Sequence, residues 1–524
     1  MALRKGKILW VDDEVELLKS HILFLRSRGF EVVPVSNGND AVELVSKENF
    51  NLVLLDEMMS GKDGLTTLRE IKDINPSLPV IMITKNEEES LMEKAIGGKI
   101  TDYLTKPVNP SQILMACKKV LEQQRISSEH ASRDYMLEFH QISKRLYDDL
   151  NADDWIDIYQ KLCRWQVEFD LHPDLGLQET LVDQMRDCNI EFGKFIEKNY
   201  QDWIHEDVHF RPTLSPDIIR KNILPLLKKD QKVLLLIIDC LRVDQWMVLE
   251  PLLYDFYNIK SDYYFSVIPS ATPYARNAIF RGLFPDDIQN EYPDIWTRPE
   301  EDDEISMNRH EFSMLQRFLE EEEVHLQSSL KYEKVIDSNE GWAIDKKINS
   351  YLNHPFLAVV ANFVDILAHR RSDSDILKEI VSDETSYRSV IKSWFQHSWI
   401  FSMLRKFAEN DYTVILTSDH GSVRVQNDVK VIADKTTSPN VRFKVGNNLN
   451  CPPKYALVIK DPGRYKLPTI GINSNYLISK ENFYFVYPNN YHKFQAYYRD
   501  TFQHGGMSME EMILPVVTMT PKNM

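Results

Sequence analysis

"VILTSDHGSV", residues 414–423, is an apolar run that ends in an aspartate and a histidine, with a glycine behind them. The same arrangement recurs where "VLLLII" ends at Asp239 and where "FLAVVANFV" ends at Asp365. In a doubly wound α/β fold, the carboxyl ends of parallel strands meet at one edge of the sheet and form a ligand-binding crevice. Because helix-like segments separate these runs, we predict such a fold for residues 208–524.

Residues 1–123 repeat this pattern on a smaller scale. The apolar runs "KILWV", "NLVLL" and "PVIMI" are each followed by polar side chains, and we expect Asp12, Asp13, Asp56, Thr84 and Lys106 to converge at the strand ends. Three carboxylates at one point favour a hard divalent cation such as Mg²⁺. An aspartate beside Mg²⁺ and a lysine is suited to forming an acyl phosphate, because both cations offset charge on the phosphoryl oxygens.

The stretches "VDDE", "LLDEMMSGKDG", "IMIT" and "DYLTKP" together resemble the receiver domain of two-component response regulators. The resemblance implies a flavodoxin-like fold, phosphorylation by a sensor histidine kinase, and a homodimer that forms on phosphorylation. The residues that it implies are Asp56 as the phosphorylation site, Asp12, Asp13 and the Met58 carbonyl as Mg²⁺ ligands, Thr84 and Lys106 as phosphoryl contacts, and Tyr103 as the aromatic that turns inward on activation.

Length and composition restrict the remaining possibilities. A chain of 524 residues exceeds what one hydrophobic core usually spans, so we expect three domains. The net charge of −17 would repel phosphate backbones, so we expect no direct DNA binding. The five scattered cysteines contain no C-x-x-C pair, which argues against a disulfide framework. Because no apolar run is long enough for a signal-peptide core or a membrane span, we expect a cytoplasmic protein without membrane contact.

Residues 124–207 show no strand-like alternation, and acidic side chains strongly outnumber basic ones there. Apolar residues recur at steps of three and four in three successive segments, which is the pattern of a buried helix face. One such stripe consists of Trp155, Ile158, Leu162, Trp165 and Phe169. We predict a three-helix bundle that connects two domains and offers a surface for a dimer. Its exposed faces would be too acidic to read DNA.

The last domain carries a set of side chains suited to metal binding. His369 stands four residues after Asp365, so the two share one face of a helical turn, and His504 precedes two glycines in "HGGMSMEE". The full set is Asp239, Thr272, Asp365, His369, Asp419, His420 and His504. Aspartate and histidine ligands without thiolates suit Zn²⁺ or Mn²⁺, and the set is large enough for two ions. Two such ions can clamp a phosphoryl group and activate a hydroxyl, for which Thr272 is the candidate.

"TSDHG" and "HGGMSMEE" resemble the alkaline phosphatase superfamily, and "LIIDCLRVDQW" with "SATPYARNAIFRG" resembles its PglZ branch. The resemblance implies that Thr272 attacks phosphorus and forms a covalent intermediate that water then hydrolyses. Arg276 or Asn277 could contact a phosphoryl oxygen, or either could brace its helix. The implied metal sets are Asp239, Thr272, Asp419 and His420 for one ion, and Asp365, His369 and His504 for the other.

A receiver (1–123), a helical connector (124–207) and a PglZ domain (208–524) in this order resemble response regulators linked to type IX secretion, which implies regulation of that system. As an enzyme, the protein would hydrolyse a phosphoester. A diester, such as a nucleotide derivative, is favoured because no basic cluster near Thr272 would neutralise a dianion. The alternative is a metal-braced pseudoenzyme whose last domain binds a partner, such as a transcription factor, when Asp56 is phosphorylated.

Overall fold

The computed structural model describes residues 6–75, 77–85, 100–296, 307–324, 326, 330–371, 374–431, 438–471, 473–487 and 491–522. The chain divides into two compact units, Met1–Phe139 with Glu168–Gln178 and His140–Val167 with Glu179–Met524. None of the helices in the described ranges combines the length and the apolar character needed to cross a membrane.

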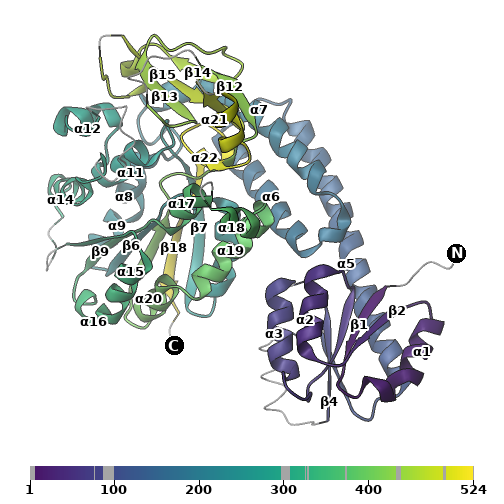
Figure 1. Ribbon diagram of the computed structural model, residues 1–524. Helices are drawn as coiled ribbons and strands as arrows, with labels where there is room; N and C mark the ends of the chain where they lie inside the picture. Colours follow the sequence, from purple (N-terminus) through teal and green to yellow (C-terminus); the bar gives the residue numbers. More distant parts are fainter. Residues whose placement is uncertain are drawn as a thin grey trace. The chain divides into compact units, whose positions relative to one another are not determined.

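The first unit contains a five-stranded parallel sheet (Figure 1). Its strands lie in the order β2-β1-β3-β4-β5, and every neighbouring pair is parallel. This is the strand order of the flavodoxin-like doubly wound fold, so the predicted fold class is confirmed. The strands are β1 (Lys7–Val11), β2 (Glu31–Val35), β3 (Leu52–Asp56), β4 (Val80–Thr84) and β5 (Asp102–Thr105).

Helices cover both faces of this sheet. α1 (Lys19–Ser27), after a short 3₁₀ turn at Val15–Leu18, packs on one face together with the start of α5 (Pro110–Arg145). α2 (Gly38–Lys47) and α3 (Gly64–Ile74) pack on the other face. Each fully buried aliphatic side chain in these two layers contributes roughly 1.5–3 kcal/mol. The layers therefore hold the parallel strands in register, and the polar residues at their carboxyl ends face one crevice.

The connector is helical, as the sequence predicts, but its first helix is not separate. α5 continues unbroken from the receiver sheet to Arg145, so residue 124 lies inside a helix. The physical reason is that no helix-breaking glycine or proline follows Pro110 within the sequence of α5. α6 (Ala152–Leu171), a 3₁₀ turn (Pro173–Leu175) and α7 (Gln178–Trp203) follow.

The second unit is built around a six-stranded sheet in the order β7-β18-β10-β6-β9-β8. β10, β6, β9 and β8 are parallel, whereas β18 runs antiparallel to both β10 and β7. β6, β9 and β10 are buried along their whole length, which explains their continuous apolar sequences. The strands are β6 (Val233–Ile238), β7 (Tyr257–Phe265), β8 (Lys331–Val335), β9 (Phe356–Ala361), β10 (Thr413–Thr417) and β18 (Ile513–Pro521).

Helices pack around this sheet and form its hydrophobic core, which includes Trp246, Tyr387 and Phe407. The alternation of strands and helices predicted for this region is therefore present. The helices are α8 (Ile218–Asn222), α9 (Leu224–Leu227), α10 (Val243–Leu249), α11 (Thr272–Arg281), α12 (Pro285–Glu291), α14 (Glu311–Glu321), α15 (Ser338–Lys346), α16 (Ile348–Tyr351), α17 (Phe363–Arg370), α18 (Asp375–Ile380), α19 (Glu384–Gln396) and α20 (Trp399–Ala408).

Three small sheets lie between β10 and β18 in the sequence. A buried guanidinium fastens this insertion to the segment that precedes β18, because Arg442 makes two hydrogen bonds to the carboxylate of Glu511, at 2.9 and 2.5 Å. The elements are β11 (Val423–Arg424), β12 (Asn427–Lys430), β13 (Phe443–Asn447), β14 (Ala456–Ile459), β15 (Ser474–Ser479), β16 (Phe483–Val486), α21 (Tyr491–Tyr498), β17 (Phe502–Gln503) and α22 (Met509–Met512).

Candidate functional site

The first cluster of predicted residues stands at the carboxyl edge of the receiver sheet. Asp12 and Asp13 follow β1, Asp56 ends β3, and their carboxylate oxygens lie within 4.8 Å of one another. Lys106, directly after β5, places its ammonium 2.9 Å from Asp56 Oδ2 and 3.2 Å from Asp12 Oδ2. The structure therefore brings together three carboxylates and one lysine that are far apart in the sequence.

Burial and the hydrogen bond between Lys106 and Asp56 act in opposite directions on the pKa values of these two groups. Burial raises the pKa of Asp56, and the hydrogen bond from Lys106 opposes that shift. Burial alone would lower the pKa of Lys106, but its hydrogen bond to Asp56 and the charge of Asp12 outweigh burial and raise it. The backbone N–H of Ser60 donates to Asp13 Oδ2 at 2.9 Å and lowers the pKa of that carboxyl. Three negative charges and one ammonium leave a net charge that one Mg²⁺ would balance.

Three other predicted receiver residues lie around this cluster. The hydroxyl of Thr84, at the end of β4, donates a hydrogen bond to the Glu57 carboxylate next to Asp56. The side chain of Met58 is 64% exposed, so only its backbone belongs to the crevice. Tyr103 is 42% exposed, on the surface rather than turned inward. Glu57 as a partner of Thr84 was not predicted from the sequence.

The predicted residues of the PglZ domain also follow strands. Asp239 comes directly after β6, and Asp419 with His420 follows β10. Asp365 and His369 lie on α17, the helix after β9, and His504 follows β17. Thr272 is the first residue of α11. Six of these side chains form two groups of possible metal ligands, Asp239 with Asp419 and His420, and Asp365 with His369 and His504.

The first group is completely buried, and the buried Thr272 lies beside it. Thr272 Oγ1 lies 2.9 Å from His420 Nε2, which in turn lies 3.4 Å from Asp239 Oδ1. Neither carboxylate oxygen of Asp419 has a hydrogen-bond partner within the described ranges, although both are shielded from solvent. A buried carboxylate without hydrogen bonds is strongly unfavourable unless a cation compensates it. These residues therefore fit a divalent metal ion.

The second group adjoins the first, since the rings of His420 and His504 stack with centroids 4.2 Å apart. Asp365 Oδ1 lies 3.3 Å from His369 Nε2 and 3.6 Å from His504 Nε2. The two imidazole nitrogens of His369 and His504 are 3.0 Å apart. Three ligand atoms that converge in this way also fit a metal ion, and the side chain of His369, 43% exposed, opens this group to solvent.

The protonation states of the second group favour metal binding. Burial lowers the pKa of His504 well below its ordinary value, and the neighbouring His420 adds to that shift. Burial would raise the pKa of Asp365, but the charge of His369 and its hydrogen bond outweigh burial, so the net shift is downward. A neutral imidazole and an ionised carboxylate are the forms that bind metals.

The two residues predicted as phosphoryl contacts have partners inside the protein. The buried guanidinium of Arg276 donates to Asp239 Oδ2 at 2.9 Å and pairs with Glu311 Oε1 at 2.9 Å. The Asn277 amide donates to the carbonyls of Pro273 and Met307, at 2.8 and 3.2 Å. Both residues brace the site, and a contact of either with a substrate remains a prediction. Glu311 was not predicted, because it begins α14 and no apolar strand precedes it.

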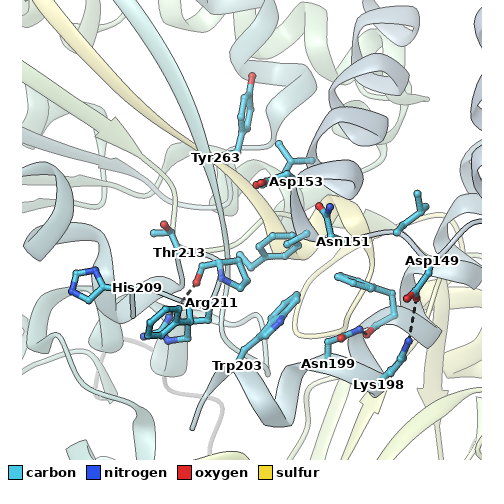
Figure 2. A pocket seen from close by; sticks show the side chains of 17 residues that line it. Asp149, Asn151, Asp153, Lys198, Asn199, Trp203, His209, Arg211, Thr213 and Tyr263 are labelled. Atoms are coloured by element: carbon cyan, nitrogen blue, oxygen red, sulfur yellow. Dashed lines mark hydrogen bonds and ion pairs between the residues drawn. The ribbon is translucent and has the colours of Figure 1, made fainter. Parts of the chain in front are cut away.

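A pocket of about 580 Å³ lies elsewhere in the second unit (Figure 2). It is lined by the connection between α5 and α6, the end of α7, residues 209–213 and β7, and it includes Lys198, which pairs with Asp149 at 3.1 Å. No predicted site residue lines this pocket. It is therefore not part of either metal-ligand group.

Comparison with known families assigns three consecutive segments. Residues 8–118 match the response regulator receiver domain, residues 125–204 the PorX response regulator linker domain, and residues 218–519 the BREX system PglZ alkaline phosphatase-like domain. The chain belongs to the family of PglZ alkaline phosphatase-like proteins, within the alkaline phosphatase superfamily. Its order of domains is that of a PorX-like response regulator. The receiver domain implies a phosphodonor such as a sensor histidine kinase.

Curated relatives match the receiver segment. The chain is 35% identical over 120 residues to the transcriptional regulatory protein ZraR of Klebsiella oxytoca, covering 23% of this chain and 27% of that protein. It is 31% identical over 115 residues to the transcriptional regulatory protein ResD of Bacillus subtilis (strain 168), covering 22% and 48%. The chain thus spans between about a quarter and a half of the length of these two relatives. A CheY-like receiver structure from Methanospirillum hungatei JF-1 is 28% identical, covers 23% of this chain and 95% of that chain, and has a TM-score of 0.22.

Proposed function

We propose that the protein is a response regulator, phosphorylated on Asp56, whose PglZ domain is a zinc-dependent phosphoesterase with Thr272 as its nucleophile. The observation that carries this proposal is the position of Thr272 Oγ1, 2.9 Å from His420 Nε2 and within a buried group of metal-binding side chains. A hydroxyl is a weak nucleophile unless a base or a metal activates it. Its position beside Asp239, Asp419 and His420 supports the proposal that a bound metal would activate it.

The ligand chemistry supports two Zn²⁺ ions, with Mn²⁺ as the alternative, because the ligands are aspartates and histidines without a thiolate. Asp239, Thr272, Asp419 and His420 would hold one ion, and Asp365, His369 and His504 the other. When bound, the ions would lower the pKa of the Thr272 hydroxyl and stabilise negative charge on the phosphoryl oxygens.

The reaction then proceeds in two displacements on Thr272. The Thr272 hydroxyl gives up its proton to solvent as Oγ1 forms a bond to phosphorus. The ester P–O bond breaks, and the leaving alkoxide takes up a proton from solvent. Water next attacks the phosphorus atom bound to Thr272 and the P–Oγ1 bond breaks. The phosphate product is released, which is a monoester when the substrate is a diester, and a proton from the water restores the Thr272 hydroxyl. Helix α11 supports Thr272 as well. Arg276 lies one turn further along this helix and donates a hydrogen bond to Asp239, which fixes the orientation of that carboxylate.

A phosphodiester, such as a nucleotide derivative, is the favoured substrate class. Among the described residues that contact the first group, the guanidinium of Arg276 is paired with Asp239 and Glu311. Its charge is therefore largely neutralised within the protein. A diester brings one negative charge to the site, whereas a monoester dianion brings two that would need further cations.

The proposed role of the receiver is control. Mg²⁺ would bind Asp12, Asp13 and the Met58 carbonyl, and the phosphoryl group on Asp56 would contact Thr84 and Lys106. Turning of Tyr103 would accompany activation and formation of a homodimer. The linker family and the domain order support a role in regulating type IX secretion.

Release of nitrophenol from aryl phosphate mono- and diesters, with Zn²⁺ or Mn²⁺ present, tests the enzyme directly. We expect wild type to cleave the diester faster than the monoester, and Thr272→Val to lower kcat at least about 1,000-fold because the nucleophile is gone. Thr520→Val, the same change at an exposed site on β18, serves as the matched control and should keep full activity. Equal rates for wild type and Thr272→Val would contradict the proposal.

That outcome would favour the second candidate, a metal-braced pseudoenzyme that binds a partner such as a transcription factor. The observation behind this candidate is burial, since Asp239, Thr272, Asp419 and His420 are all fully shielded from solvent. A closed metal group of this kind is also how structural sites are built.

A further inference from the structure

Two of the buried polar residues of helix α7 form hydrogen bonds with the PglZ domain. They are Asn189 and Tyr200, about three helical turns apart, among apolar residues such as Phe192 and Ile196. α7 lies within residues 125–204, which match the linker family, and not within residues 218–519, which match the PglZ family. Each of the two residues contacts a different loop of the hydrolase site.

Asn189 holds the segment that follows His504. Its Oδ1 accepts the backbone N–H of Met509 at 2.8 Å, and its Nδ2 donates to the Glu510 carboxylate at 2.9 Å. The same segment touches the other ligand loop, because the backbone N–H of Gly421 donates to the Glu511 carbonyl at 3.2 Å. Space there is tight, since a Cβ on Gly421 would lie 1.9 Å from the Glu510 carbonyl oxygen. A shift of this segment would therefore move His504 and disturb His420.

Tyr200 holds the loop that precedes Thr272. Its hydroxyl accepts the backbone N–H of Ile268 at 3.1 Å, four residues before the nucleophile. The two loops are also joined to each other, because Ser270 Oγ donates to the Gly506 carbonyl at 2.7 Å. The nucleophile loop and the His504 loop thus form one hydrogen-bonded unit, which α7 supports at two points.

These contacts specify position more strongly than apolar packing does. Asn189 is 5% exposed and Tyr200 is 1% exposed, so any displacement of α7 would leave buried polar groups without partners. An unpaired buried group costs about 1–3 kcal/mol, whereas an apolar contact can slide at much lower cost. Groups that orient metal ligands in this way commonly change metal affinity or activity about 10- to 100-fold when removed.

We propose that Asn189 and Tyr200 of the linker helix are positioning residues of the phosphoesterase: Asn189 places the ion held by His504, and Tyr200 places the Thr272 nucleophile. This inference rests on the proposed function. The linker helix α7 would then help to hold the hydrolase site in its active geometry. Because α7 contacts both the Thr272 loop and the His504 loop, any rearrangement of α7 would act on the two loops together.

Two substitutions in the full-length protein separate the roles. Asn189→Ala is expected to lower the affinity for one of the two zinc ions about 10- to 100-fold, measured by zinc content and by competition with a chromophoric chelator. Tyr200→Phe is expected to leave two zinc ions bound and to lower kcat for the aryl diester at least about 10-fold with little change in KM. We expect kcat to fall with little change in KM because Tyr200 orients the Thr272 hydroxyl and does not itself bind the substrate.

Matched controls come from the same unit. Asn199→Ala removes an amide on α7 that donates to the Phe195 carbonyl of the same helix, at 2.8 Å. Tyr257→Phe removes a buried hydroxyl that donates to the Leu404 carbonyl at 2.6 Å. Both controls should keep two zinc ions and full kcat. If Asn189→Ala fails to fold, the isosteric Asn189→Asp, which loses the donor to Glu510, replaces it and should show the same loss of zinc.

Three outcomes decide the inference. Two tightly bound zinc ions in Asn189→Ala together with unchanged kcat in Tyr200→Phe would overturn it. Losses of the same size in Asn199→Ala and Tyr257→Phe would also overturn it, since they would indicate general destabilisation. A wild type that binds two zinc ions but hydrolyses no ester would refute the proposed function, while selective zinc loss in Asn189→Ala would still support the positioning role of Asn189.

Discussion

The receiver site and the PglZ site both lie at the carboxyl ends of parallel strands, yet they balance their charges differently. In the receiver, the Lys106 ammonium lies 2.9 and 3.2 Å from two of the three carboxylates and supplies a permanent cation. In the PglZ domain, the Asp419 carboxylate makes no hydrogen bond within the described ranges, and Arg276 is shared with Glu311. Asp239, Asp419 and His420 are completely shielded from solvent, whereas Asp13 of the receiver and His369 of the second PglZ group are exposed.

The difference indicates two kinds of metal use. A site that carries its own ammonium and has an exposed carboxylate can exchange Mg²⁺ and a phosphoryl group with solvent, as a switch requires. In the buried group of Asp239, Asp419 and His420, the Arg276 guanidinium lies 2.9 Å from Asp239 and 3.6 Å from Asp419 but is shared with Glu311, so we expect resident metal ions to stabilise this group. We therefore expect a transient metal site in the first unit and a more permanent one in the second, although both lie at the carboxyl ends of parallel strands.

The largest expected effect is the loss of receiver phosphorylation when Asp56 is replaced. With acetyl phosphate and Mg²⁺, wild type should gain one phosphoryl group by intact mass, and Asp56→Asn should gain none because the nucleophilic carboxylate is lost. Asp73→Asn, the same change at an exposed position in the receiver, is the control and should be phosphorylated normally. Zinc content should be identical in all three proteins, and a lower zinc content in Asp56→Asn would contradict the separation of the two sites.

A smaller effect is expected on thermal stability when zinc or Mg²⁺ is removed, and it should differ between the two sites. Stripping zinc with a strong chelator should lower the unfolding midpoint of the PglZ unit by at least about 5 °C, because bound ligand stabilises the native state by mass action. Omitting Mg²⁺ should change the receiver midpoint by less than about 2 °C, since Lys106 already offsets part of the charge. The measurement is differential scanning calorimetry of the full-length protein, and equal shifts for the two ions would refute the distinction.

Much of the fold, and the clustering of the candidate ligand side chains at the strand ends, could be predicted from the sequence. Strand-like apolar runs that end in Asp56, Asp239 or Asp419 can be recognised in the sequence, because buried parallel strands are continuously apolar and the polar residue at their carboxyl end enters the crevice. The pairing of Asp365 with His369 is similarly visible from their helical spacing.

The supporting residues could not be predicted, for physical reasons that differ from case to case. Glu311 begins a helix and is recognisable as part of the site only through its partner Arg276. Asn189 and Tyr200 lie in an amphipathic stripe in which a buried polar residue looks like any other core position. Their roles depend on loops that are distant in sequence, and periodicity carries no information about such contacts.

Anomalous diffraction at the zinc absorption edge, from crystals of the zinc-loaded protein, tests the central claim most directly. We expect two peaks in the PglZ domain, one among Asp239, Thr272, Asp419 and His420, the other among Asp365, His369 and His504. The receiver crevice should show none at that edge when Mg²⁺ is supplied. The absence of peaks at the seven PglZ residues, or a zinc ion bound elsewhere in that domain, would contradict the account.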